Sequence, residues 1–157
     1  VKPVWIELGL QTSNERTARL INRCYDTCIY DETMAKLREL GVHIIVHMII
    51  GLPGESKEDM LETVRYIVRS GADGIKLQLL HVLRGTVLER MYESGGLHAL
   101  SFDEYADILC DCLKEIPPGM VVHRFTGDGP KNLLVAPKWS ADKKMVINRL
   151  NKIIADL

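Results

Sequence analysis

Several features that would narrow the class of protein are missing from this sequence. No apolar run reaches the length of a transmembrane helix, and the first residues show no charged-then-apolar signal segment. The 20 Lys and Arg residues almost balance the 21 Asp and Glu residues, which argues against a strongly charged surface spread over the whole chain. Four cysteines do not suggest a disulfide framework. We therefore expect a cytoplasmic protein with reduced thiols and no membrane partner.

The chain contains enough apolar residues for one domain with a hydrophobic core. It has 157 residues, of which 46% are hydrophobic and 26% are charged. Patterns with a period of two or short apolar runs predict strands at 1–10, 43–50, 74–82 and 120–125. Helical periodicity and capping residues predict helices at 13–22, 31–40, 56–70, 101–116 and from 140 to the end. Residues 23–30 and 84–100 are predicted as loops, the second with one helical turn at 88–92.

The unit at 43–70 is the clearest of these patterns. An apolar strand is followed by the turn Gly51-Leu52-Pro53-Gly54-Glu55, and Ser56 with Asp59 forms a capping-box pattern at the start of a helix. A second capping box is predicted at Ser101 and Glu104. Four strands that are each followed by a helix indicate a parallel α/β fold, whose site lies where the strands end.

Polar residues interrupt three of the four predicted strands. They are Glu7 and Gln11, then His47, then Lys76 and Gln78. An unpaired buried polar group costs about 1–3 kcal/mol, so this many in adjacent strands would be costly in an ordinary core. We predict that they line a shared polar cavity. Arg124 and Asp128, at and beyond the last predicted strand, are weaker candidates on the substrate side.

The ordered segments ELGLQT, INRCYD, HMIIGLPGES and GIKLQLLHVLRGT resemble the carboxyl-terminal part of a radical SAM catalytic domain. The closest resemblance is to the YhcC/YtqA-like branch, which is related to the elongator-type proteins. It implies a partial TIM-type (β/α) barrel that uses S-adenosylmethionine and a [4Fe-4S] cluster to generate a 5′-deoxyadenosyl radical. Residues 1–157 would supply barrel units four to six, with 120–157 as the terminal strand, loop and helix.

The three-cysteine cluster motif of that family, C-x3-C-x2-C, is absent from the sequence. Cys24 and Cys28 have the first spacing, but Asp31 stands where the third ligand would be. We interpret these two as loop or partly buried thiols, and Cys112 as a core residue. The resemblance therefore implies that an N-terminal barrel half supplies the cluster, and that this chain alone is inactive. The elongator-type relatives suggest an RNA substrate by analogy only.

The resemblance assigns candidate cofactor contacts to the first half of the chain. Gln11 matches a strand-end residue near the cofactor, although a strand-end amide also satisfies backbone groups. Arg23 matches a position that pairs with the methionyl carboxylate, a task suited to a guanidinium, and a solvated loop arginine is the alternative. His47 stands where related branches bind the ribose through an Asp, and the alternative is a core histidine with satisfied hydrogen bonds.

Four further candidates follow from the same resemblance. Gly51 and Gly54 would let the backbone approach the adenosine, although a tight turn alone explains them. Lys76 and Gln78 lie on the strand used for adenine and substrate contacts, and His81 points to the other side.

Two other functional classes stay open. One is an iron-free α/β enzyme that binds a nucleotide or phosphate, although the Gly51–Gly54 turn lacks the Walker A lysine and the dinucleotide spacing. The other is a non-catalytic half-barrel that docks on a partner chain.

Overall fold

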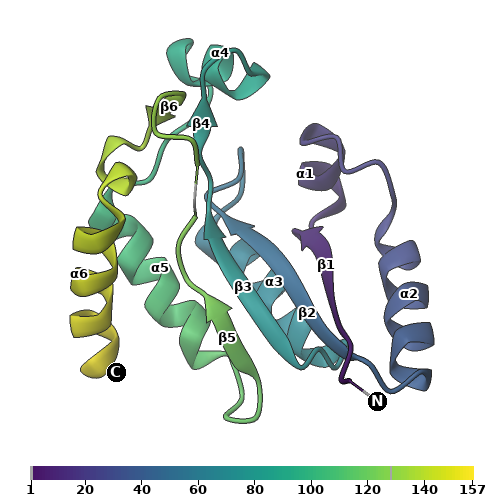
Figure 1. The fold of residues 1–157 in the computed structure, drawn as a ribbon. Coiled ribbons are helices and arrows are strands. Elements are labelled where there is room, and N and C mark those ends of the chain that lie inside the picture. The colour runs from purple at the N-terminus through teal and green to yellow at the C-terminus, as the bar shows by residue number, and fades with distance from the viewer. Residues whose placement is uncertain (1, 128) are drawn as a thin grey trace.

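The chain forms a four-stranded parallel sheet in the computed structural model, which describes residues 2–127 and 129–157. The strands run in the order β1-β2-β3-β5 (Figure 1). Their bounds are Trp5–Gln11 for β1, His43–Ile50 for β2, Gly74–Leu79 for β3 and Val121–Arg124 for β5. Four parallel strands alternating with helices confirm the predicted fold class. The predicted candidate Asp128 lies outside the described residues.

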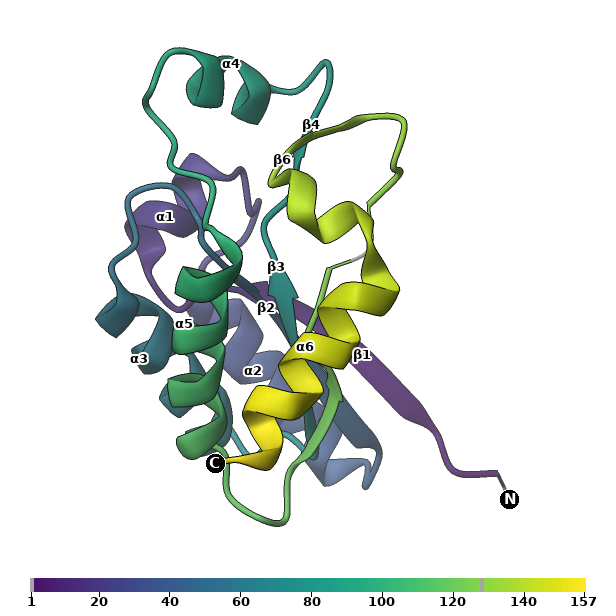
Figure 2. The ribbon, with the colours of Figure 1, turned by 90° about the vertical axis from the view of Figure 1, so that its left-hand side faces the viewer.

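The described helices leave one face of this sheet uncovered (Figure 1). They are α1 (Glu15–Leu20), α2 (Thr27–Glu39), α3 (Lys57–Arg69), α4 (Val87–Glu93), α5 (Phe102–Lys114) and α6 (Lys143–Ala155). Figures 1 and 2 show α3 and α5 behind the sheet, α2 beside β1 and α6 beside α5. None of the described helices is long and apolar enough to cross a membrane.

The core lies between the sheet and the helices behind it. Alternate side chains of β2 point to this side, and Ile44, Val46 and Ile50 are all fully buried. From the helices, Ile67 of α3 and Leu109 of α5 meet them with no exposed surface. Truncating one such side chain to Ala costs about 2–5 kcal/mol, so this layer fixes the positions of the strands.

Both predicted capping boxes are present, whereas the starts of the first two helices were predicted wrongly. Helix α1 is capped by Asn14 instead of Ser13, because the Asn14 side chain accepts hydrogen bonds from two backbone N–H groups of the first turn. Ser13 instead contacts Thr63 of α3. Helix α2 begins at Thr27, after Asp26, so the second half of the predicted loop at 23–30 is helical. Burial of Tyr30 in the core explains this extension.

A small second unit above the long strands was not predicted. Strand β4 (Val82–Leu83) pairs antiparallel with β6 (Leu134–Ala136), and a 3-10 helix, η1 (Lys138–Ala141), precedes α6. The third parallel strand therefore ends at Leu79 instead of 82, and α6 begins at Lys143 instead of 140. Figures 1 and 2 place β4, β6 and α4 together beyond the carboxyl ends of the sheet. The unit has its own apolar cluster around Val82, Leu97 and Ala136.

Candidate functional site

A network of polar side chains crosses the uncovered face of the sheet. Lys76 Nζ lies 2.5 Å from Glu7 Oε1, and His47 Nε2 lies 2.8 Å from Glu7 Oε2. Gln78 Nε2 lies 2.9 Å from His47 Nδ1. Glu7 comes from β1, His47 from β2, and the other two from β3. Three strands thus bring these predicted polar residues together on one face.

The hydrogen-bond pattern assigns the roles of the His47 ring nitrogens. The Gln78 amide donates to Nδ1, which leaves Nε2–H to donate to Glu7, as a neutral imidazole allows. The side chains of Lys76 and His47 are 15% and 21% exposed, whereas that of Glu7 is 48% exposed. The hydrogen bond from Lys76, followed by that from His47, lowers the pKa of Glu7 below 4.5. The face therefore carries an ionised carboxylate beside an ammonium group.

Gln11 joins this face because the end of β1 changes direction. Gln11 has a left-handed φ of 67°, and the β1–β2 register shifts between Gly9 and Gln11. A Cβ atom on Gly9 would lie 2.7 Å from Gln11 Nε2. Gly9 of β1 is paired in register with His47 of β2. The Gln11 carboxamide lies over Gly9, in the space that a side chain at this position would fill. The glycine thus makes room for a carboxamide beside the polar network.

Arg124 of β5 lies next to the polar network, on the side of β3 that faces away from β2. It is paired in register with Lys76, and it is exposed. Its predicted place on the substrate side stays a prediction.

Arg23 lies apart from this face, and its guanidinium is engaged within the chain. Nη1 donates to the carbonyl oxygens of Leu10 and Thr12 at 3.1 and 2.8 Å, and Nε donates to that of Tyr25 at 3.0 Å. Nη2 contacts Glu15 and Thr27. With its side chain 3% exposed, Arg23 has no N–H group left for a ligand unless one of these bonds breaks. Its contact with a methionyl carboxylate stays a prediction.

The two glycines of the turn between β2 and α3 lie in different surroundings. Both have left-handed φ values, 92° for Gly51 and 76° for Gly54, which favour glycine. A Cβ on Gly51 would meet Leu100 at 3.0 Å, so apolar packing fills this side of the residue. Gly54 lines a hollow of about 400 Å³ with Asn14 and Arg16 of α1. Neither glycine lies in the polar network, and their contact with adenosine stays a prediction.

Glu55, next to this turn, ties the ends of β1 and β2 together. Its carboxylate accepts a hydrogen bond from the Thr12 hydroxyl, directly after β1. Burial raises the pKa of Glu55 above 4.5, against the opposing effect of hydrogen bonds from Thr12 and Thr17. Glu55 was not among the predicted contacts. The feature of the sequence that could have indicated Glu55 is the presence of one carboxylate in a turn otherwise made of Gly, Leu and Pro.

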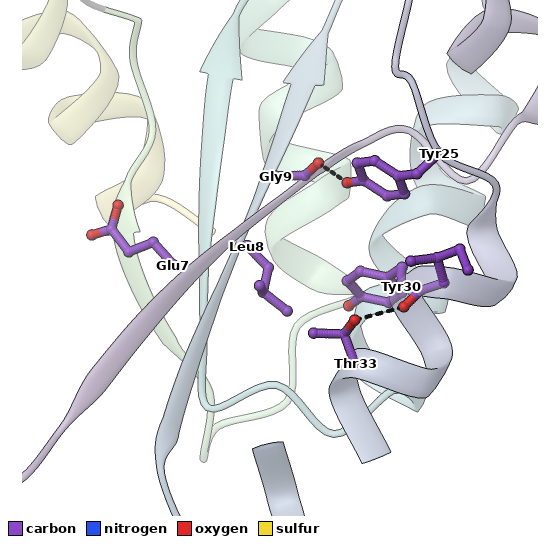
Figure 3. Close-up of a pocket in the computed structure, with 7 residues that line it drawn as sticks. Glu7, Leu8, Gly9, Tyr25, Tyr30 and Thr33 are labelled. Atoms are coloured by element: carbon purple, nitrogen blue, oxygen red, sulfur yellow. Dashed lines mark hydrogen bonds between the residues drawn. The ribbon is translucent and has the colours of Figure 1, made fainter. Parts of the chain in front are cut away.

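A separate groove runs between β1 and α2. Its volume is about 400 Å³, and its lining includes Glu7, Leu8, Gly9, Tyr25, Ile29, Tyr30 and Thr33. Figure 3 shows the Tyr25 hydroxyl bonded to the Gly9 carbonyl, while the Glu7 side chain points away from α2. The groove therefore adjoins the outer edge of β1, whereas the polar network lies on the face of the sheet.

No group of three metal-binding side chains occurs within the described part of the chain. All four cysteines are free. Cys24 and Cys28 are exposed, and Cys110 and Cys112 are buried. Cys112 has no exposed surface, which confirms it as a core residue, whereas Cys28 lies in α2 instead of the predicted loop. The donor set fits no iron-sulfur cluster.

The four parallel strands and their helices define part of a parallel (β/α) barrel. Residues 1–67 match the Radical SAM superfamily, and residues 72–156 match the Radical SAM C-terminal domain. The chain belongs to the radical SAM superfamily, in the elongator-related branch that the sequence motifs indicated.

Two curated relatives and one solved structure illustrate this membership. The uncharacterized protein YtqA of Bacillus subtilis is 48% identical over 149 residues, which are 95% of this chain and 46% of the relative. Protein YhcC of Escherichia coli is 34% identical over 140 residues, 89% of this chain and 45% of the relative. Elp3 of the archaeon Methanocaldococcus infernus, solved with an N-terminal deletion, gives a TM-score of 0.80 at 20% identity over 95% of this chain and 36% of that one. The chain thus spans less than half the length of these relatives.

Proposed function

We propose that the polar face of the sheet binds S-adenosylmethionine as the second half of a radical SAM barrel. In this proposal residues 1–157 supply barrel units four to six, with 120–157 as the terminal strand, loop and helix. The observation that carries the proposal is the meeting of four predicted cofactor residues, Gln11, His47, Lys76 and Gln78, on one face. These residues come from three adjacent strands and have no common role in the core.

The donor set on this face fits the polar groups of the cofactor. Gln11 and Gln78 each offer a carboxamide, which can donate to and accept from an adenine edge or ribose hydroxyls. The Glu7 carboxylate provides negative charge for the sulfonium or amino group, and Lys76 holds that carboxylate in place. Bound next to a reduced cluster, S-adenosylmethionine would supply the radical chemistry for hydrogen abstraction from a substrate.

The cluster itself does not fit the residues of this chain. We therefore propose that the other half of the longer protein provides its cysteines, and that this chain alone takes up no [4Fe-4S] cluster and is inactive. A cytoplasmic location is part of the proposal and is supported by the four free thiols.

Titration calorimetry with S-adenosylhomocysteine, a cofactor analogue, tests the proposal on the protein completed to the length of its relatives. Substituting Lys76→Met should weaken binding at least about tenfold, because the network loses the charged hydrogen bond that holds Glu7. The control Lys36→Met removes an exposed lysine of α2 and should leave affinity unchanged. Equal affinities for both variants would refute the proposed site. Tighter binding of ATP than of the analogue would instead support an iron-free nucleotide-binding enzyme.

The charge distribution favours RNA as the substrate class. Residues 120–157 contain seven Lys and Arg against three Asp and Glu, although the whole chain carries a net charge of −1. Exposed members of this set, Lys131, Lys138 and Lys144, belong to the segment that forms β6, η1 and α6. Phosphate backbones bind such basic segments with strong salt dependence.

Fluorescence anisotropy with a labelled RNA stem-loop tests this second proposal. Binding should weaken as salt rises, and the double variant Lys131→Glu/Lys144→Glu should bind more weakly than the control Lys36→Glu/Lys114→Glu, which carries the same charge change. Indistinguishable affinities for the two double variants would contradict an RNA site here.

A further inference from the structure

The last residue of β1 has a backbone conformation that residues with side chains rarely adopt. Gln11 has a φ of 67°, and around it the Thr12 N–H group donates to the Leu10 carbonyl at 2.9 Å. A hydrogen bond between residues two apart, closed around a residue with positive φ, is typical of the rare and strained form of the γ-turn. Such a conformation persists only where the surrounding structure holds it in place.

One nitrogen atom of Arg23 bonds to both ends of this turn. Nη1 donates to the carbonyl oxygens of Leu10 at 3.1 Å and Thr12 at 2.8 Å. Two oxygens that share one nitrogen at these distances lie closer together than about 6.6 Å, which is the separation of residues two apart in a regular strand. The guanidinium can therefore make both hydrogen bonds only while the chain is bent at Gln11.

Arg23 is itself fixed by the helices on either side of it in the sequence. Nη2 donates to the Thr27 hydroxyl at 2.9 Å and lies 3.3 Å from Glu15 Oε1, and Nε donates to the Tyr25 carbonyl at 3.0 Å. Because the donors of a guanidinium lie in one rigid plane, these contacts also fix the direction of Nη1. Arg23 thus connects the first residues of α1 and α2 to the end of β1.

The bend determines where the Gln11 carboxamide lies. In a regular strand, Gly9 and Gln11 would direct their side chains to the same face about 6.6 Å apart. A Cβ on Gly9 would instead lie 2.7 Å from Gln11 Nε2, so the carboxamide folds back over Gly9. Gly9 is paired in register with His47, and its carbonyl accepts from the Tyr25 hydroxyl (Figure 3). The turn therefore directs the carboxamide towards the polar network.

We propose that Arg23 is a positioning residue of the cofactor site. It holds the turn at Gln11, and the Gln11 carboxamide, not the guanidinium, contacts S-adenosylmethionine. This role rests on the proposed function and is an alternative to the contact with the methionyl carboxylate that the family resemblance implies. It is supported by the acceptors that all three guanidinium nitrogens have within the chain. A change at Arg23 should therefore affect the adenosine part of the ligand, where a carboxamide can bind.

Two ligands that differ in one part distinguish these roles. S-adenosylhomocysteine carries the amino-acid carboxylate, whereas 5′-methylthioadenosine has the same adenosine and thioether but no carboxylate. Arg23→Lys keeps the charge and loses the planar set of donors. In the protein completed to the length of its relatives, titration calorimetry should show about tenfold weaker binding of both ligands. A loss confined to S-adenosylhomocysteine would overturn the proposal, and the control Arg19→Lys, at an exposed arginine of α1, should change neither affinity.

A double variant separates positioning from general damage to the fold. Gln11→Gly removes the carboxamide, while glycine adopts the left-handed φ without strain. If Arg23 acts through Gln11, adding Arg23→Lys to Gln11→Gly should weaken binding no further, because the two residues then act as one unit. Losses that add independently would contradict the proposed role.

NMR spectroscopy of the same protein without ligand tests the position of Gln11 directly. A nuclear Overhauser effect should connect the Gln11 side-chain amide protons to the Gly9 α protons, and Arg23→Lys should abolish it whereas Arg19→Lys retains it. Persistence of this contact in folded Arg23→Lys would refute the positioning role. If neither ligand binds the unsubstituted protein, the proposed function fails, and this contact still decides whether Arg23 positions Gln11.

A milder variant covers the case in which Arg23→Lys does not fold by circular dichroism. Thr27→Val removes one acceptor of the guanidinium and keeps the guanidinium itself. It should weaken binding of both ligands by about threefold and reduce the nuclear Overhauser effect between Gln11 and Gly9. Unchanged affinities together with an unchanged contact would overturn the proposal.

Discussion

The Lys76 ammonium reaches Glu7 across β2, so that one ion pair spans three neighbouring strands. The two atoms are 2.5 Å apart, and His47 of the middle strand contacts the same carboxylate. The pair therefore fixes the relative positions of β1 and β3, which make no strand ladder with each other. The Glu7 carboxylate also neutralises the Lys76 ammonium group on this face of the sheet.

Removing the Glu7 charge should change stability in a pH-dependent way. The folded-state pKa of Glu7 is lowered below 4.5, so its stabilisation is complete above that pH and is lost as pH falls through the folded-state value. We expect Glu7→Gln to lower the free energy of unfolding by only about 0.2–1 kcal/mol at pH 7, because an ion pair at an exposed carboxylate stabilises little. In acid, the free energy of unfolding of this variant should approach that of the unsubstituted chain. Urea unfolding at several pH values measures the difference. A constant difference at every pH would contradict this account, and the exposed Glu39→Gln serves as control.

The capping box of α5 should be sensitive to stronger acid. Hydrogen bonds from Ser101 and then His98 lower the pKa of Glu104 to about 2. The stabilisation of the folded chain by the Glu104 carboxylate is therefore present above pH 4.5 and is lost as the pH falls towards 2. Ser101→Ala should cost about 1 kcal/mol at pH 7 by removing the cap of the helix that carries Leu109. Thermal unfolding measures both effects, and an unchanged stability of Ser101→Ala at neutral pH would count against them.

Glu55 should respond to pH in the opposite direction. Its folded-state pKa is raised above 4.5 by burial, so the folded chain holds this proton more tightly and the contribution of Glu55 to stability falls as pH rises above 4.5. Glu55→Gln keeps an acceptor for the Thr12 hydroxyl without the charge. We expect its unfolding free energy at pH 7 to equal or exceed that of the unsubstituted chain by up to about 1 kcal/mol. A clear loss of stability at pH 7, with none at pH 4, would show that the charged form is the stabilising one.

Gly9→Ala should move the Gln11 carboxamide with little effect on the fold. The new Cβ would lie 2.7 Å from Gln11 Nε2, and the flexible end of that side chain can shift. We expect unchanged thermal stability but weaker binding of S-adenosylhomocysteine, by about tenfold if Gln11 contacts the ligand. Gly54→Ala is not a suitable control because its left-handed φ adds strain, so Gly119→Ala, in open space, is used instead. Equal affinities for Gly9→Ala and Gly119→Ala would remove Gln11 from the site.

The sheet was predictable from the sequence because its signals are local. Apolar runs in β2 and β3, and the boxes Ser56/Asp59 and Ser101/Glu104, each specify their element within a few residues. The shared face of His47, Lys76 and Gln78 followed from the period of two in neighbouring parallel strands. Helix α2 was misjudged because Asp26 and Asp31 are both suitable caps, and only the burial of Tyr30 selects the earlier one.

The remaining features depend on contacts between distant segments. The pairing of β4 with β6 joins residues about fifty positions apart through strands of two and three residues, too short for a periodic signal. The engagement of Arg23 by the carbonyls of Leu10 and Thr12 depends on the bend that follows β1. The motif identified Arg23 as a candidate contact of the cofactor, but only the folded structure shows which groups of the chain accept its hydrogen bonds.

The small apolar cluster around Val82, Leu97 and Ala136 is separate from the cluster that holds the sheet. Substitutions in this small cluster are therefore expected to leave the packing of the parallel sheet unchanged. The unit over the strand ends can in this way vary in sequence without disturbing the core that positions the strands.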